Sequence, residues 1–144
     1  MSATLTDERI ATRLAHVDEH VRAERAHELD ALVDTFGDHP FWDDRGANER
    51  HNGRDGVRAY YAELFAGFPD FSFDISRRHI AADAVILEVV AHGTHTGSWK
   101  GIEPTARRVE FPACVVFTFD ETDRLEAETV YFDRMTVLAQ LGVI

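Results

Sequence analysis

The stretch that decides the fold is HGTHTGSWKGIEPTARRVEFP, residues 92–112. Its glycines, Gly93, Gly97 and Gly101, recur every four residues, and a Pro-Thr pair at 104–105 then breaks the chain. A new apolar run starts at Val109. Because glycine inside an alternating run marks a bulge or a sharp bend, the stretch predicts a bent strand, a turn and a second strand.

Strand-like runs make up most of the second half of the chain, and turn residues separate them. These runs cover residues 71–79, 84–99, 109–120 and 125–132. The two long runs meet at the glycines of the opening stretch, which predicts a strongly curved sheet.

Three helical segments precede the strands, each with apolar residues at helical spacing. Their apolar faces run over residues 10–21, 29–36 and 57–65. Thr6 is a good N-cap for the first helix, and Gly37 is expected to end the second. His39-Pro40 supports that break, and Phe41-Trp42 is expected to form a short strand or a helix-to-loop anchor. Residues 43–53 are expected to form a loop, and the last ten residues a helix or coil.

Helices followed by antiparallel strands are typical of an α+β fold. We therefore expect one domain over residues 1–144, in which a cone-shaped, curved antiparallel sheet is packed by about three N-terminal helices. A cone of this kind has an apolar mouth, a shape that suits the binding of a small molecule.

Composition excludes several classes of protein. The net charge of −11 and the single lysine argue against a nucleic-acid partner, because phosphate backbones need clustered Lys and Arg. No apolar run approaches the roughly 18 residues that cross a bilayer, and the N-terminus does not resemble a signal peptide. The lone Cys114 cannot form an intrachain disulfide, so a cytoplasmic, reducing location is expected.

Several short blocks carry a resemblance to a known family, the SnoaL-like polyketide cyclases of the nuclear-transport-factor-two-like superfamily. The blocks are His51–Gly53, Phe68–Asp70, Gly93–Gly97 continuing through Gly101-Ile102 and Pro104-Thr105 to Arg107-Arg108, and Asp133 with Leu138 and Gln140–Gly142. The resemblance implies a dimeric or tetrameric α+β barrel whose internal cavity binds polycyclic aromatic molecules. It also implies intramolecular aldol ring closure without metal or cofactor.

Two positions depart from what the resemblance implies for catalysis. The family's Asp on the last strand corresponds to Val130, and its His on the strand before corresponds to Val115. If both valines face the cavity, Phe111 and Phe117 share their face, and Glu128 is the nearest carboxylate. Glu128 is then a candidate general base or acid; the alternative is that Glu126 and Glu128 lie at a solvated rim.

Other candidates have an acid–base or a binding role. His51, His95 and Asp133 match the family pattern, although each histidine could be structural and Asp133 could be a helix N-cap. Trp42, Tyr60 and Trp99 could stack on a flat ligand, or could belong to the core.

Two further sets of residues are weaker candidates. His16 and His20 lie four apart, but no third ligand is visible, so we expect a solvated helix face that also includes His27 and no metal site. An epoxide hydrolase of this fold would need an arginine between two carboxylates inside the cone. Arg58 and the Arg77-Arg78 pair are present, but nothing in the sequence predicts that they point into the cone.

The sequence leaves two classes of function open. The first is a cofactor-free cyclase or isomerase acting on a small hydrophobic, polyketide-like or steroid-like molecule, or an epoxide hydrolase. The second is a non-catalytic ligand-binding or oligomerisation domain of the same fold. In either case we expect a homodimer through the outer sheet face, because Cys114, Val116 and Thr118 would otherwise expose a β-branched strand.

Overall fold

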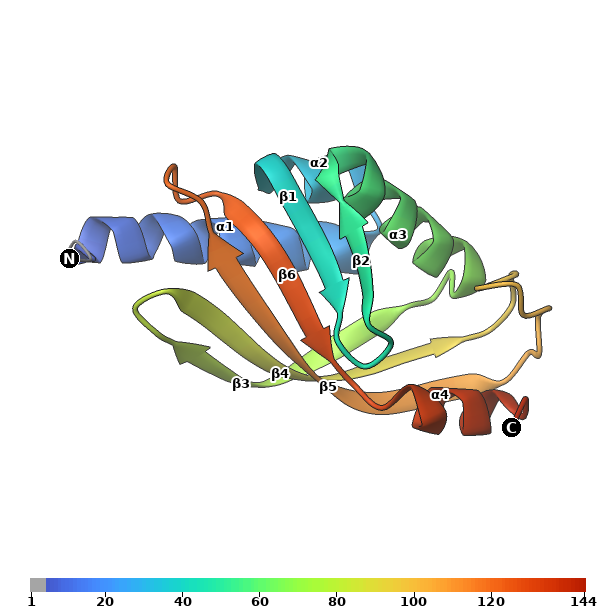
Figure 1. Cartoon of the computed structure of the whole chain (residues 1–144). Helices are drawn as coiled ribbons and strands as arrows, with labels where there is room; N and C mark the ends of the chain where they lie inside the picture. Colours follow the sequence, from blue (N-terminus) through green and yellow to red (C-terminus); the bar gives the residue numbers. More distant parts are fainter. Residues whose placement is uncertain (1–4) are drawn as a thin grey trace.

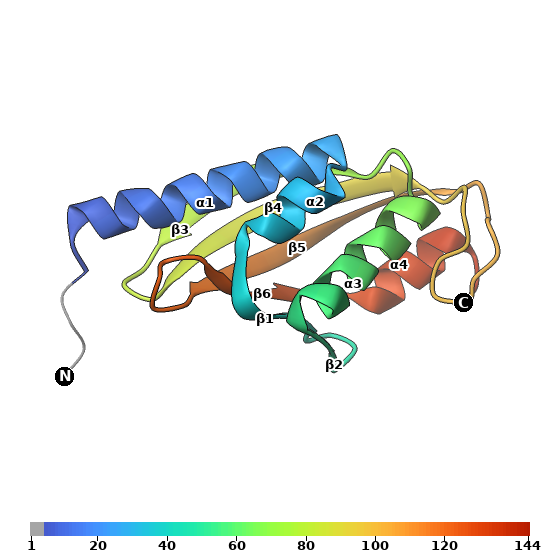
Figure 2. The same cartoon turned by 90° about the horizontal axis from the view of Figure 1, so that it is seen from above.

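The fold is built on a single curved sheet of six strands, with helices packed on its concave side (Figures 1 and 2). The computed structural model describes residues 5–144. The helices are α1 (Asp7–Ala26), α2 (Leu29–Asp34), α3 (Gly53–Gly67) and α4 (Arg134–Leu141). The strands are β1 (Phe36–Asp44), β2 (Glu49–Asn52), β3 (Ser72–Ile80), β4 (Ala84–Thr94), β5 (Arg108–Phe119) and β6 (Leu125–Tyr131). The α+β prediction is confirmed.

The strand order is β2-β1-β6-β5-β4-β3, and all neighbours are antiparallel except β1 and β6. The parallel contact brings β1, from the first third of the chain, beside the last strand. None of the helices within residues 5–144 is both long and apolar enough to cross a membrane.

The first helix begins at the residue expected from its sequence. Thr6 caps it, accepting a hydrogen bond from the backbone N–H of Arg9 through its side chain. His27 ends it with φ of 55°, a left-handed conformation. The helix lies along the sheet (Figure 2), and Val17 and Val21 are buried in the core.

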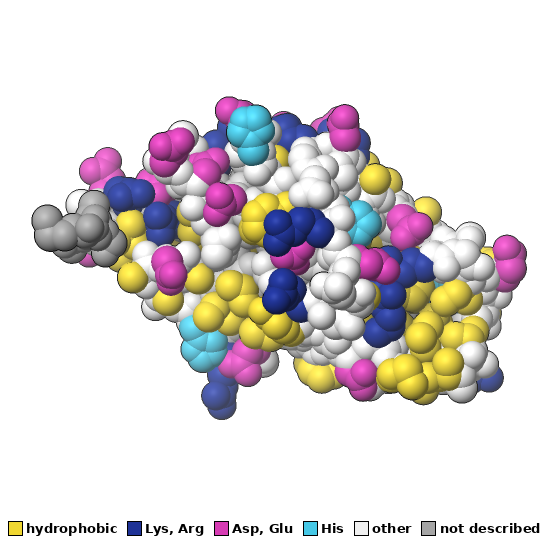
Figure 3. Space-filling model, in the orientation of Figure 1, with side chains coloured by type: hydrophobic (Ala, Val, Ile, Leu, Met, Phe, Trp, Pro, Cys, Tyr) yellow, Lys and Arg dark blue, Asp and Glu magenta, His cyan; other side chains and the backbone are white. Residues whose placement is uncertain are grey.

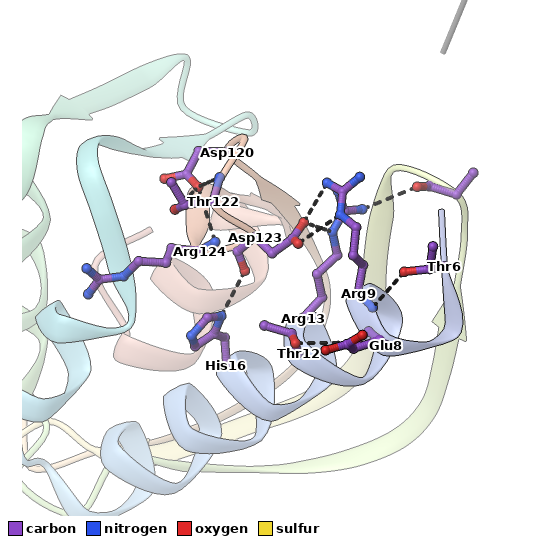
Figure 4. A network of polar contacts seen from close by, with 11 residues as sticks. Thr6, Glu8, Arg9, Thr12, Arg13, His16, Asp120, Thr122, Asp123 and Arg124 are labelled. Carbon is purple, nitrogen blue, oxygen red and sulfur yellow. Dashed lines mark hydrogen bonds and ion pairs between the residues drawn. The ribbon is translucent and has the colours of Figure 1, made fainter. Parts of the chain in front are cut away.

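The N-terminal end of α1 is tied to the turn between β5 and β6 by charged groups (Figure 4). Asp123 in that turn accepts hydrogen bonds from Arg9 at 2.8 and 2.9 Å and from Arg13 at 2.8 Å. The Nδ1 atom of His16 lies 2.8 Å from the backbone carbonyl of Asp123. These contacts fix one end of the helix over the sheet.

Between residues 36 and 53 the sequence prediction is only partly right: the short strand expected as one alternative at Phe41-Trp42 is part of β1, but the rest of the prediction is wrong. Gly37 and Pro40 do not end a helix but lie within β1, and the predicted loop contains β2. The β1–β6 register shifts between Phe36 and Phe41, and this irregularity accommodates a glycine and a proline that lacks an N–H donor.

The other four strands match their predicted ranges, except that β4 ends at Thr94 rather than at Trp99. Residues 95–107 instead fold into a loop. Gly97 lies so close to the end of α3 that a Cβ would approach the carbonyl oxygen of Ala66 to 1.9 Å. Gly101, with φ of +76°, makes the turn between the bridged residues Trp99 and Ile102. The glycine pattern therefore marks a packed loop after a strand.

The outer face of the sheet carries a row of partly buried apolar side chains. Cys114 pairs across the strands with Tyr131, and Val116 pairs with Ile86 on one side and Thr129 on the other. Tyr131 is 50% exposed. Figure 3 shows hydrophobic side chains gathered on this side of the molecule, over the lower strands and over α4.

Candidate active site

A cavity of about 90 Å³ lies between the concave face of the sheet and helices α1 and α3. One water needs about 10–15 Å³ by the same kind of measure, so the cavity has room for a small molecule. Most of its wall is aromatic or aliphatic. The seven residues predicted to contact the ligand all lie in this wall: Trp42, Tyr60, Trp99, Phe111, Val115, Phe117 and Val130.

The strand register predicted from the alternation of β5 is confirmed. Val115 and Val130 are cross-strand partners and both line the cavity. Phe111 and Phe117 lie on the same face, whereas Phe119 lies beyond the cavity, where Arg13 packs over its ring. Two valines therefore occupy the wall where the family resemblance implies an acid–base pair.

Four titratable side chains from three elements meet in the wall of this apolar cavity. They are His20 and Glu24 of α1, Tyr61 of α3 and Glu128 of β6. None is more than 8% exposed. Tyr61 donates its hydroxyl proton to Oε2 of Glu128, and Nε2 of His20 lies 3.3 Å from a carboxylate oxygen of both Glu24 and Glu128. The expectation that Glu128 lies at a solvated rim is wrong, while Glu126 is exposed.

Hydrogen bonds fix the orientation of the His20 ring. Its Nδ1 lies 3.1 Å from Oγ1 of Thr35, and that hydroxyl donates to the backbone carbonyl of Leu32 at 2.7 Å. Since the Thr35 proton is committed to the carbonyl, Nδ1 must be the donor in the first contact. Nε2 is then the atom that titrates, and it faces both carboxylates.

The charges in the cluster favour an imidazolium. Burial alone would lower the pKa of His20, but the charges and hydrogen bonds of Glu128 and Glu24 outweigh it and raise the pKa to about 9. Burial raises the pKa of Glu24, and the charge of Glu128 adds to that shift. Burial likewise raises the pKa of Tyr61 well above its ordinary value, so its hydroxyl stays protonated as a donor. A protonated His20 thus faces the Glu128 carboxylate, with Glu24 drawn towards its neutral form.

The same histidine and glutamates are also a group, among residues 5–144, that could hold a metal ion. One ligand atom of each of His20, Glu24 and Glu128 lies within 4.8 Å of the others. The expectation that His20 lies on a solvated face without further ligands is therefore wrong. The contacts between Nε2 of His20 and the two carboxylates, and between Tyr61 and Glu128, already pair these groups without an ion.

The three other predicted catalytic residues lie outside the cavity wall. His95 is fully buried, but its Nδ1 accepts from the backbone N–H of Thr105 at 3.2 Å, so it holds the 95–107 loop. Asp133 is the N-cap of α4, accepting from the backbone N–H of Met135 at 3.1 Å. His51 is half-buried on β2 with its ring edge against Trp42.

Sequence reasoning missed His20, Glu24 and Tyr61. A signal was present for the first two, since His20 and Glu24 continue the helical spacing of Val17 and Val21 on the apolar face of α1. A polar residue on an apolar stripe is buried when the stripe packs, and it then needs a partner. Tyr61 carried no such signal, because a tyrosine on an apolar face is ordinary.

Comparisons with known proteins agree with this architecture. A SnoaL-like protein from Jannaschia sp. CCS1 superposes with a TM-score of 0.80 at 19% identity, covering 100% of this chain and 98% of that chain. The epoxide hydrolase/cyclase-like enzyme SalBIII, which has a role in pyran ring formation in salinomycin, gives 0.74 at 20% identity, with 90% and 95% covered. A LEH-like epoxide hydrolase from M. tuberculosis gives 0.72 at 20% identity, with 92% and 91% covered.

At these identities the solved structures show a shared fold and no more. No curated protein matches the sequence. The family model described as SnoaL-like polyketide cyclase matches residues 16–141, nearly the whole chain. The chain therefore belongs to the SnoaL-like polyketide cyclase family.

Proposed function

We propose that this protein is a cofactor-free acid–base enzyme that moves a proton on a small apolar molecule, as a cyclase or isomerase does. The observation that carries the proposal is the set of four buried, mutually bonded titratable groups in the wall of an apolar cavity. Burying such groups costs free energy, and perturbed titratable groups in a cavity are typical of catalytic sites.

Glu128 is the group that would face the substrate as the base. Its Oε2 is occupied by Tyr61 and His20, and Oε1 has no hydrogen bond within the described part of the chain. In this proposal His20 and Tyr61 hold Oε2 in place, while Oε1 remains available. His20, Glu24 and Tyr61 are then positioning residues.

The reaction balances without a co-reactant. Oε1 of Glu128 takes the proton from a carbon next to a carbonyl, and the C–H electron pair forms the enolate. In an isomerisation, the glutamic acid returns the proton to another carbon. In a ring closure, the enolate carbon bonds to a second carbonyl carbon, and the resulting alkoxide takes the proton.

Epoxide hydrolysis is the second candidate, and one observation favours it. The Glu24–His20–Glu128 set places a cation between two glutamate side chains, which resembles the arginine between two carboxylates that an epoxide hydrolase of this fold would require. Arg58 pairs instead with Asp30 at the surface at 2.7 Å. In this reaction Glu128 would deprotonate a water whose oxygen attacks an epoxide carbon, and the opened oxygen would take a proton from the cluster.

Deuterium exchange tests the proposal without knowledge of the natural substrate. The bicyclic ketone 1-tetralone carries exchangeable protons beside its carbonyl, and their loss in D₂O is followed by NMR. The wild-type protein should accelerate the exchange above the spontaneous rate. Glu128→Gln keeps the shape but removes the base, so the accelerated rate should fall by about 100-fold or more.

Glu126→Gln is the matched control, because Glu126 lies on the same strand and is exposed. It should exchange the ketone at the wild-type rate. Equal rates for Glu128→Gln and wild type would contradict the proposal, and bound ketone with no accelerated exchange would favour the non-catalytic class. Incorporation of ¹⁸O from labelled water into the diol of an apolar epoxide would favour the hydrolase.

A further inference from the structure

The wall next to Glu128 contains a second polar group that the proposed proton transfer does not use. Trp42 of β1 lies opposite Glu128 in the parallel register of β1 and β6, so both side chains face the cavity side by side. The Trp42 side chain is buried, with only 2% of the residue exposed. Its indole Nε1–H has no hydrogen-bond acceptor within residues 5–144.

Neighbouring aromatic residues hold the indole ring in place, but none of them accepts a hydrogen bond from its N–H group. Tyr60 stacks on the ring at 3.6 Å between centroids, with the planes inclined by 22°. His51, opposite Trp42 on β2, places its ring at 5.9 Å and nearly perpendicular. Nε2 of His51 itself lacks a partner, so it does not accept the indole proton. A buried donor without an acceptor is costly, and Trp42 lines the cavity, so an oxygen of a bound molecule is the acceptor that would satisfy it.

We propose that Trp42 is a substrate-positioning residue whose indole N–H binds a neutral carbonyl or hydroxyl oxygen of the ligand, next to the Glu128 carboxylate. The proposal deepens the proposed function, on which it rests, by naming the group that the substrate must carry. Because Trp42 and Glu128 are register partners on β1 and β6, an oxygen bound by the indole would share the part of the wall that holds the proposed base. The indole also stabilises charge that develops on that oxygen when an enolate forms.

The charges around Trp42 favour a neutral oxygen over a carboxylate or phosphate in the resting ligand. Two carboxylates, Glu24 and Glu128, line the same cavity, and the cation among them, His20, is already paired with both. Burial raises the pKa of Tyr60 well above its ordinary value, and the charges of Glu128 and Glu24 raise it further. An anion beside Tyr60 and Trp42 would meet the same unfavourable field.

The protein has two tryptophans, which makes a direct test simple. A ¹⁵N-labelled sample gives two indole N–H resonances, and Trp42→Phe identifies that of Trp42 by its loss. Adding 1-tetralone should move the Trp42 resonance downfield, as expected for a new hydrogen bond. Tetralin, which has the same ring system without the oxygen, should not move this resonance. Trp42→Phe should weaken 1-tetralone binding about fivefold and leave tetralin binding unchanged.

Two results would overturn the inference. One is a Trp42 resonance that stays in place at saturating ketone while Trp42→Phe binds the ketone as tightly as wild type. The other is an identical shift with ketone and tetralin, which would indicate displacement of a resident water. Neither bears on whether Glu128 is a base. Conversely, a specific ketone shift without deuterium exchange would leave the Trp42 site standing and remove the proposed reaction.

Discussion

His20 of α1 and Glu128 of β6 meet inside the cavity, with Nε2 of the histidine 3.3 Å from Oε2 of the glutamate. One residue comes from the first helix and the other from the last strand, so their contact exists only when the fold is complete. Because both are buried, their charges interact strongly with each other and weakly with solvent. Stability and the proposed chemistry therefore depend on the same pair.

The first prediction concerns the pH dependence of stability. The pKa of His20 is raised from 6.5 to about 9 in the folded protein, so the folded state binds this proton more tightly than the unfolded chain. The stabilisation is complete below pH 6.5 and is lost as the pH rises through about 9. It amounts to roughly 3 kcal/mol, and the raised pKa of Glu24 acts in the same direction. Urea unfolding at pH 6, 8 and 10 measures it.

His20→Gln separates this effect from other groups that titrate at alkaline pH. The variant cannot take up the proton, so it should be less stable than wild type at pH 6. Its free energy of unfolding should also change less between pH 6.5 and 9.5. An equally steep decline in the variant would show that His20 is not the group responsible.

The second prediction concerns the hydroxyl of Tyr61, which donates to a buried carboxylate. Tyr61→Phe leaves Oε2 of Glu128 without this donor, and such bonds to charged groups contribute about 1.5–3 kcal/mol. We expect a loss of that size in the free energy of unfolding at pH 7. Tyr60→Phe is the control, since Tyr60 stacks on Trp42 and lies outside the cluster; a loss as large there would contradict the assignment.

Much of the fold follows from local sequence. The apolar residues of β5 alternate with a period of two, and counting along β5 and β6 correctly placed Val115 and Val130 in the cavity wall. Most of β1 was missed because Gly37 and Pro40 break the local pattern, while the strand is stabilised by pairing with the distant β6. Local signals cannot report a partner that lies far along the chain.

The site was only partly predictable for the same reason. Glu128 emerged from counting along one strand. The role of His20 depends on how α1 packs against the sheet, because only that packing brings His20 next to Glu128. The sequence of α1 alone does not specify this position. His95 belongs to the family pattern, yet the structure uses it to hold a loop through Thr105. A family pattern records which residues a fold needs as well as those that a reaction needs.

The third prediction concerns Asp123 in the turn before β6 (Figure 4). Hydrogen bonds from Arg9 lower the pKa of this carboxyl to about 2, against a smaller opposing effect of burial, and Arg13 adds to the lowering. A lowered pKa stabilises the folded protein above pH 3.8, and the stabilisation is lost as the pH falls through about 2. Because Arg9 is partly exposed, we expect roughly 1–2 kcal/mol.

Asp123→Asn tests this while keeping the backbone, since asparagine tolerates the positive φ of 63° at this position. The variant should be less stable at pH 6 and should lose less stability between pH 4 and 2 than wild type. Glu121→Gln, an exposed change in the same turn, should behave as wild type. Acid unfolding curves that coincide for wild type and Asp123→Asn would refute the role of this anchor.

The fourth prediction concerns the outer sheet face. We propose that a second copy of the chain covers it, because Val116, Cys114 and Tyr131, the cross-strand partner of Cys114, form an apolar row. Hydrophobic side chains gather on this side of the molecule (Figure 3). Light scattering at micromolar concentration should then give the mass of a dimer, and Val116→Lys should shift it to that of a monomer by burying an unpaired charge in the contact. Ala11→Lys, an exposed change on α1, should remain dimeric. A monomeric wild-type protein under these conditions would contradict the proposed dimer. A Val116→Lys variant that still dimerises would show that the interface lies elsewhere.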